Sequence, residues 1–211
     1  MTDLVFYTNP MSRGRIVRWM LEETGAPYQA RVLQYGPEMK SPEYLAINPM
    51  GKVPAIRHGE VVVTEGAAIC AYLADAFPEA RLAPPVTSPE RGPYYRWLFF
   101  GAGPVEAAVT NSSLGVRTET PEVMSRVGYG SLPLVLDTLE KLLADRQYVL
   151  GDRFSAADVY LGAQIGWGLQ FGTMEERPGF RAYADRLASR PAAVRARQMD
   201  DALMPGAAGT G

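Results

Sequence analysis

The residues best placed to do chemistry lie between positions 48 and 66, in the stretch N-P-M-G-K-V-P-A-I-R-H-G-E-V-V-V-T-E-G. Pro54 opens a predicted strand at residues 55–57, although a proline cannot donate a hydrogen bond to a sheet ladder. A cis Val53–Pro54 bond would explain its presence, because it turns the N–H and C=O of Val53 outward as a paired donor and acceptor. Such a pair suits the backbone of a peptide-like ligand.

Composition excludes several classes of protein. The chain has 211 residues, enough for one large domain or two small ones, and 21 Lys and Arg against 23 Asp and Glu. This balance gives no basic footprint for a nucleic acid partner. Neither a membrane-spanning run nor a signal pattern is seen, so we expect a cytoplasmic protein without a membrane partner. The single cysteine, Cys70, and the single histidine, His58, predict no disulfide framework and no metal cluster.

The first part of the chain predicts an α/β domain. Strands are expected at residues 4–7, 28–33, 55–57 and 61–63, and helices at 13–24, 42–47 and 66–77. Gly25 and Pro27 are natural stop signals for the first helix. The resulting order β-α-β-α-β-β-α is the one that a thioredoxin-like domain uses.

The second part predicts helices only. Residues 78–89 carry four prolines and indicate a linker. We therefore expect a first domain at 1–80, a linker at 81–89 and an all-helical domain at 90–211 that ends in a disordered tail, 205–211. Helices are expected at 89–113, 121–145, 155–170 and 178–189, with a kink at Pro104 and a shorter helix after Pro191.

A capping box begins one of these helices, in G-D-R-F-S-A-A-D-V, with Ser155 at the N-cap and Asp158 three residues later. The first half of the chain contains a Val-Pro pair, a hairpin and then an acidic residue at a helix start. This order, followed by the capping-box phrase, resembles the glutathione S-transferase family, in particular its bacterial serine-type branches. The resemblance implies the fold of that family, an α/β thioredoxin-like N-terminal domain followed by an all-α C-terminal domain. It also implies glutathione as co-substrate and no metal.

The glutathione thiol needs help to ionise, because an unperturbed thiol has a pKa of about 8.5. Ser12, just past the first strand and expected at the N-cap of the first helix, resembles the hydroxyl donor of serine-type members. Tyr7, at the strand end, is the competing donor, as in tyrosine-type members. An ordinary capping role for Ser12 and a packing role for Tyr7 are the alternatives. Neither position holds a cysteine, which argues against thiol exchange by a protein cysteine.

The resemblance also assigns the remaining groups of glutathione. The backbone of Val53 would bind the cysteinyl unit, and Lys52, or less directly Lys40, the glycyl carboxylate, although both lysines can equally be solvated. Glu65 would take the ammonium group, and the N–H of Gly66 at the helix start the α-carboxylate. The commoner family pattern has Ser or Thr after the acidic residue, so Gly66 lacks a hydroxyl worth about 0.5–1.5 kcal/mol.

Three functions compete on this evidence. The first is a glutathione transferase, with a detoxification role, that conjugates glutathione to small hydrophobic electrophiles. The second is a glutathione-dependent peroxidase or disulfide reductase, and the third a non-catalytic binding module with the same fold. A zeta-like isomerase fits less well, because residues 9–12 read Asn-Pro-Met-Ser where that class has Ser-Ser-Cys-Ser. The resemblance further implies a homodimer.

Overall fold

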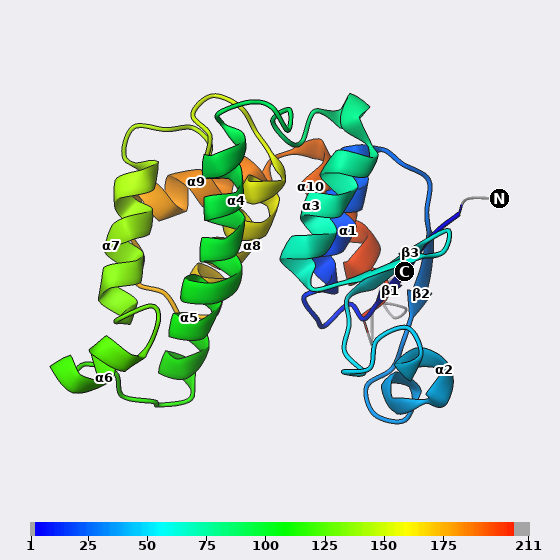
Figure 1. Cartoon of the computed structure of the whole chain (residues 1–211), viewed down its shortest axis with the longest axis horizontal. Helices are drawn as coiled ribbons and strands as arrows, with labels where there is room; N and C mark the ends of the chain where they lie inside the picture. The colour runs from blue at the N-terminus through cyan, green and yellow to red at the C-terminus, as the bar shows by residue number, and fades with distance from the viewer. Residues whose placement is uncertain (1–2, 205–211) are drawn as a thin grey trace. The chain divides into compact units, whose positions relative to one another are not determined.

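The chain folds into a four-stranded sheet with its own helices, followed by a set of helices without a sheet (Figure 1). The computed structural model describes residues 3–204. The expected disordered tail, 205–211, lies outside the described residues. The first unit contains the chain up to Leu82 and the segment from Ser189 onward, and the second contains Ala83–Ala188. The sequence placed everything after residue 90 in the helical domain. The last helix instead groups with the first unit because it packs against the first helix.

The sheet of the first unit is mixed. Its strands are β1 (Leu4–Thr8), β2 (Gln29–Val32), β3 (Ala55–His58) and β4 (Val61–Thr64). They lie in the order β2-β1-β3-β4, with β1 parallel to β2 and antiparallel to β3, and with β3 and β4 joined as a hairpin. This topology confirms the thioredoxin-like domain that the sequence predicted.

Four helices and two short 3-10 turns complete the first unit: α1 (Gly14–Thr24), η1 (Glu38–Lys40), α2 (Pro42–Leu45), α3 (Gly66–Ala76), η2 (Pro78–Ala80) and α10 (Pro191–Asp201). Figure 1 shows α1 and α3 together on one face of the sheet. α1 ends as predicted at Gly25, whose left-handed φ of 67° suits a residue without a Cβ. The 3-10 turns escaped prediction because three residues are too few to show a periodicity.

The strand β1 is buried on both faces, since successive side chains point to opposite sides of a sheet. On the α1 face, the Arg18 guanidinium lies 5.3 Å from the centre of the Phe6 ring. On the other face, an apolar cluster joins the sheet to η1 and α2; it consists of Val5, Tyr7, Met39, Tyr44 and Ala55. The end of β1 is therefore held rigidly from two sides.

The second unit is entirely helical apart from an isolated bridge: α4 (Arg91–Phe100), a π-helical turn η3 (Gly101–Val105), α5 (Glu106–Ser113), α6 (Pro121–Arg126), α7 (Leu132–Leu143), α8 (Ala156–Gln170) and α9 (Pro178–Ala188). The predicted kink at Pro104 takes the form of the π-helical turn. The prediction of one helix at 121–145 is wrong, because the segment forms two helices, α6 and α7. They are separated by a break in which Gly130 has a φ of 72°. No helix among residues 3–204 has the length and apolarity needed to cross a bilayer.

The predicted capping box is present at the start of α8 and does more than cap the helix. Asp158 is fully buried and accepts four hydrogen bonds, two of them from the N–H (2.9 Å) and Oγ (3.0 Å) of Ser155. The other two come from the Val149 N–H at 2.7 Å and the Tyr183 hydroxyl at 2.9 Å. One carboxylate thus ties α8 to the preceding loop and to α9.

The burial of Asp158 predicts a distinctive pH dependence of stability. Burial raises the pKa of Asp158 to about 6, although its hydrogen bonds lower it. The folded state therefore holds a proton that the unfolded state has lost between about pH 4 and pH 6. The natural protein and Asp158→Asn differ in their free energies of unfolding. The value for the natural protein, relative to that for the variant, should fall by about 1–3 kcal/mol as the pH rises through this window. Denaturant titrations at several pH values measure this difference, and a difference that grows with pH would contradict the raised pKa of Asp158.

Candidate glutathione site

The segment before β3 presents an unpaired backbone. The Val53–Pro54 peptide bond is cis, as the sequence predicted. Neither the N–H nor the C=O of Val53 has a hydrogen-bond partner among residues 3–204. The preceding carbonyl, that of Lys52, is fixed by the Tyr44 hydroxyl at 2.6 Å and by Asn48 Nδ2 at 2.8 Å. Val53 therefore offers a donor and an acceptor from a well-anchored segment.

The two candidate lysines differ in their surroundings. Lys52 is exposed, and its ammonium group forms no ion pair or hydrogen bond within the described part of the chain. The Lys40 Nζ donates instead to the carbonyls of Met50, at 2.9 Å, and Gly51, at 3.2 Å. Gly51 is required at this point, because it has a φ of 57° and an added Cβ would lie 2.5 Å from the backbone carbonyl oxygen of Met39. Lys40 supports the loop before Val53, whereas Lys52 is available to a ligand.

The start of α3 carries Glu65 and Gly66. Glu65 is exposed and has a φ of 66° and a ψ of 116°, a strained conformation for a residue with a side chain. Strain of this kind costs about 1–3 kcal/mol and clusters at ligand sites. The N–H groups of Gly66 and Ala67 lie in the first turn, where no intrahelical partner exists, and no side chain caps them. A carboxylate and free N–H donors thus stand next to each other, as the sequence predicted.

Ser12 lies in the turn between β1 and α1. The sequence predicted Ser12 as the N-cap of α1, but the N-cap is Arg13, and Ser12 lies half-buried one residue before it. Its Oγ accepts from the Gly14 N–H at 2.9 Å and donates to the Asn9 carbonyl at 2.7 Å. The hydroxyl proton thus points into the turn. Rotation about the Cβ–Oγ bond would redirect this proton to a ligand.

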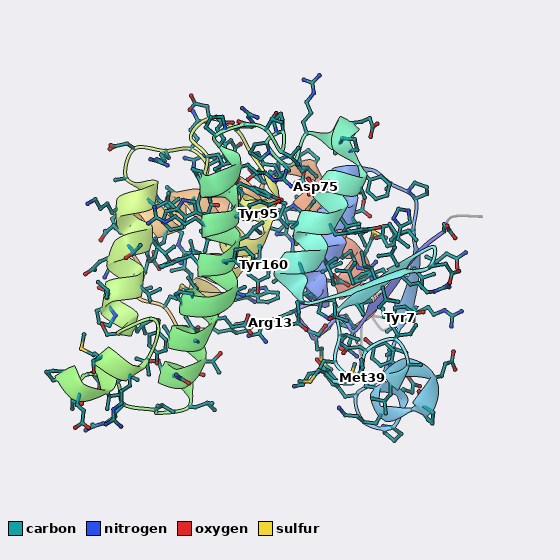
Figure 2. All side chains as sticks on the ribbon, in the orientation of Figure 1. Tyr7, Arg13, Met39, Asp75, Tyr95 and Tyr160 are labelled. Carbon is teal, nitrogen blue, oxygen red and sulfur yellow. The ribbon has the colours of Figure 1, made fainter. Side chains whose placement is uncertain are left out.

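Tyr7 is the other candidate donor and lies in the apolar cluster beside Met39 (Figure 2). Its ring centre is 5.6 Å from that of Tyr44, and its hydroxyl makes no hydrogen bond to the described residues. Burial, together with the nearby Tyr7, raises the pKa of Tyr44 to about 12, so Tyr44 remains a neutral donor to the Lys52 carbonyl. Tyr7 is 7% exposed, which restricts the access of its hydroxyl to a ligand.

Two asparagines that the sequence analysis overlooked shape this site. Asn9 Oδ1 accepts from the Met11 N–H at 2.9 Å, while its Nδ2 donates to the Leu33 carbonyl at 2.8 Å. Asn48 makes the equivalent turn, with the Met50 N–H at 3.0 Å from its Oδ1. Both begin the same tripeptide, Asn-Pro-Met, and one copy precedes Ser12 while the other precedes Val53. This repeated tripeptide was the available signal, since Asn side chains commonly close such turns.

The remaining reactive side chains lie outside this arrangement. Cys70 is fully buried, and burial raises the pKa of its thiol. The His58 Nδ1 lies 3.0 Å from the Tyr72 hydroxyl, and the His58 ring stacks on Phe77. Among residues 3–204, no group of three or more His, Cys, Asp or Glu side chains is arranged to hold a metal ion.

Comparisons with known proteins agree with this geometry. Residues 11–76 match the glutathione S-transferase N-terminal domain, and residues 126–186 the C-terminal domain. Glutathione S-transferase GstA of Escherichia coli O157:H7 is 32% identical over 71% of this chain and 74% of its own length. Maleylacetoacetate isomerase of Pseudomonas aeruginosa is 31% identical over 83% of this chain and 86% of its own length.

A solved structure extends the comparison to the ligand. The structure of a sphingomonad glutathione S-transferase complexed with glutathione is similar with a TM-score of 0.74 at 28% identity, and covers 93% of this chain and 98% of that chain. The match spans both units and thus agrees with the two family matches. The chain belongs to the glutathione S-transferase family.

Proposed function

We propose that this protein is a glutathione transferase, an enzyme that activates the thiol of glutathione for attack on small apolar electrophiles. The observation that carries the proposal is the unpaired N–H and C=O of Val53, flanked by the free ammonium group of Lys52. Relatives named as glutathione S-transferases and a glutathione-bound relative support it.

Each group of glutathione has a partner of suitable chemistry. The cysteinyl backbone pairs with that of Val53, and the glycyl carboxylate with Lys52. The γ-glutamyl ammonium pairs with Glu65, while the N–H groups of Gly66 and Ala67 bind the α-carboxylate. Four separate contacts hold a flexible tripeptide in one orientation, so the sulfur is presented at a fixed place.

Ser12 is the proposed donor to the sulfur. When glutathione binds, its hydroxyl rotates from the Asn9 carbonyl to the thiolate, and this hydrogen bond favours the ionised form. The thiol proton leaves to solvent, and the sulfur lone pair forms the C–S bond. The electrophile's leaving group departs with its bonding electrons, or a conjugated acceptor takes up the charge and is then protonated. Tyr7 is the alternative donor.

The other functions use parts of the same site. A glutathione-dependent peroxidase or disulfide reductase would need the same thiolate, and a binding module the same contacts without chemistry. The names of the relatives favour the transferase. A cytoplasmic homodimer that acts on a small hydrophobic electrophile belongs to this proposal through the family resemblance.

Replacing Glu65 with glutamine should weaken glutathione binding by about 10- to 100-fold, since hydrogen bonds to charged groups contribute about 1.5–3 kcal/mol. Calorimetric titration with glutathione measures the dissociation constant. Glu60→Gln is the matched control, because Glu60 is an exposed carboxylate in the hairpin turn between β3 and β4. Equal affinity in both variants would remove Glu65 from the site. Binding without conjugation of chlorodinitrobenzene would instead favour one of the other functions.

A further inference from the structure

The end of α10 breaks a local rule of helix stability. Asp200 and Asp201 occupy its last two positions, and its last turn contains no basic residue. The C-terminal end of a helix carries partial negative charge, so carboxylates there are unfavourable by about 0.3–1 kcal/mol each. Both carboxylates are instead paired with arginines of α1. Asp200 pairs with Arg18, and Asp201 with Arg15, each at 2.7 Å.

Arg15 connects α10 to the turn that carries Ser12. While its NH2 group pairs with Asp201, its Nε donates to the carbonyl of Pro10 at 2.6 Å. The planar guanidinium makes both contacts at once, and each fixes the direction of the other. Arg15 is therefore a bridge between the end of the chain's last helix and the segment next to the sulfur site.

The carbonyls of this turn are held one after another. The Asn9 carbonyl accepts from the N–H and the Oγ of Ser12, and the Met11 carbonyl accepts from the Tyr35 hydroxyl at 3.2 Å. The Pro10 carbonyl between them is held by Arg15. Hydrogen bonds from a charged donor are shorter and about twice as strong as neutral ones. The contact from Arg15 is thus the strongest restraint on the segment that orients Ser12.

We propose that Arg15, anchored by Asp201, is a positioning residue that fixes the turn at residues 9–13 so that the Ser12 hydroxyl reaches the glutathione sulfur. This inference rests on the proposed function, because it assigns the support of the same site. Arg15 acts through Pro10 and Ser12 and does not touch the substrate. Asp201 acts one step further away, by holding the guanidinium in place.

The test measures the thiol pKa of bound glutathione by its thiolate absorbance, together with kcat and KM. Arg15→Gln should raise that pKa by about one unit, which lowers the thiolate fraction at neutral pH by up to about tenfold, and by less where the pKa of the natural complex lies below 7. kcat should fall accordingly, whereas KM for glutathione should stay within about twofold because Val53 and Glu65 are unchanged. Asp201→Asn should shift both quantities in the same direction by less. Arg195→Gln is the matched control and should change neither, since Arg195 links α10 to Glu22, near the other end of α1.

A second comparison separates positioning from general destabilisation. In a Ser12→Ala background, Arg15→Gln should lower kcat by less than about twofold, because its effect passes through Ser12. An equal loss in both backgrounds, or a loss that follows the free energy of unfolding with the thiol pKa unchanged, would overturn the inference. Failure of the natural protein to form any bound thiolate would refute the proposed function itself. This outcome is distinguishable from those that refute only the role of Arg15.

Discussion

Replacing Asp200 with asparagine should lower the free energy of unfolding by about 3–5 kcal/mol, because it leaves a buried charge without its partner. The side chains of Arg18 and Asp200 are 2% and 1% exposed, and the Arg18 Nε lies 2.7 Å from Asp200 Oδ1. Burial disfavours the charge on Arg18, but the Asp200 carboxylate, with a smaller contribution from Tyr28, holds the pKa of Arg18 above its ordinary value. Besides its contact with Asp200, the Arg18 guanidinium donates a hydrogen bond to the neutral Tyr28 hydroxyl, at 3.2 Å.

Chemical denaturation of three variants tests this expectation. Arg195→Gln breaks an ion pair between the same two helices, but Arg195 is 54% exposed, so the loss should stay below about 1 kcal/mol. A double variant, Arg18→Met with Asp200→Leu, removes both charges and should be more stable than Asp200→Asn. If Asp200→Asn cost no more than Arg195→Gln, the pair would not behave as a buried one.

Replacing Ser12 with alanine should lower kcat/KM for glutathione conjugation by about 10- to 100-fold, the value of one hydrogen bond to a charged atom. The loss should lie in kcat, because the binding contacts at Val53 and Glu65 are untouched. Tyr7→Phe is the comparison variant, since it removes a hydroxyl that makes no hydrogen bond to residues 3–204. Steady-state kinetics at several glutathione concentrations separate the change in kcat from the change in KM. A large loss in Tyr7→Phe with little change in Ser12→Ala would transfer the role to Tyr7.

Much of the first unit follows from local signals in the sequence. Gly25 ends α1, Pro54 precedes β3, and alternating or apolar runs mark the strands, so the order of elements could be predicted. The cis Val53–Pro54 bond and the place of Glu65 at the start of α3 could be predicted because each depends on neighbours in the chain. The helix break at Gly130 was missed, since a single glycine within a periodic segment does not show which φ it adopts.

The support of the site could not be predicted, because it depends on contacts between distant parts of the chain. Arg15 and Asp201 are 186 positions apart, and Arg18 and Asp200 are 182 apart. Without the fold, the arginines of α1 are indistinguishable from solvated charges. The hydrogen bond from Lys40 to the Gly51 carbonyl likewise could not be predicted, because a sequence does not show that this carbonyl lies within reach of the ammonium group.

The central claim, that Ser12 stabilises the thiolate of bound glutathione, is tested most directly by titrating the ultraviolet thiolate absorbance of the complex with pH. The natural protein should ionise the bound thiol well below its free value of about 8.5, and Ser12→Ala should return the pKa towards that value. A low thiol pKa that Ser12→Ala leaves unchanged would contradict the claim.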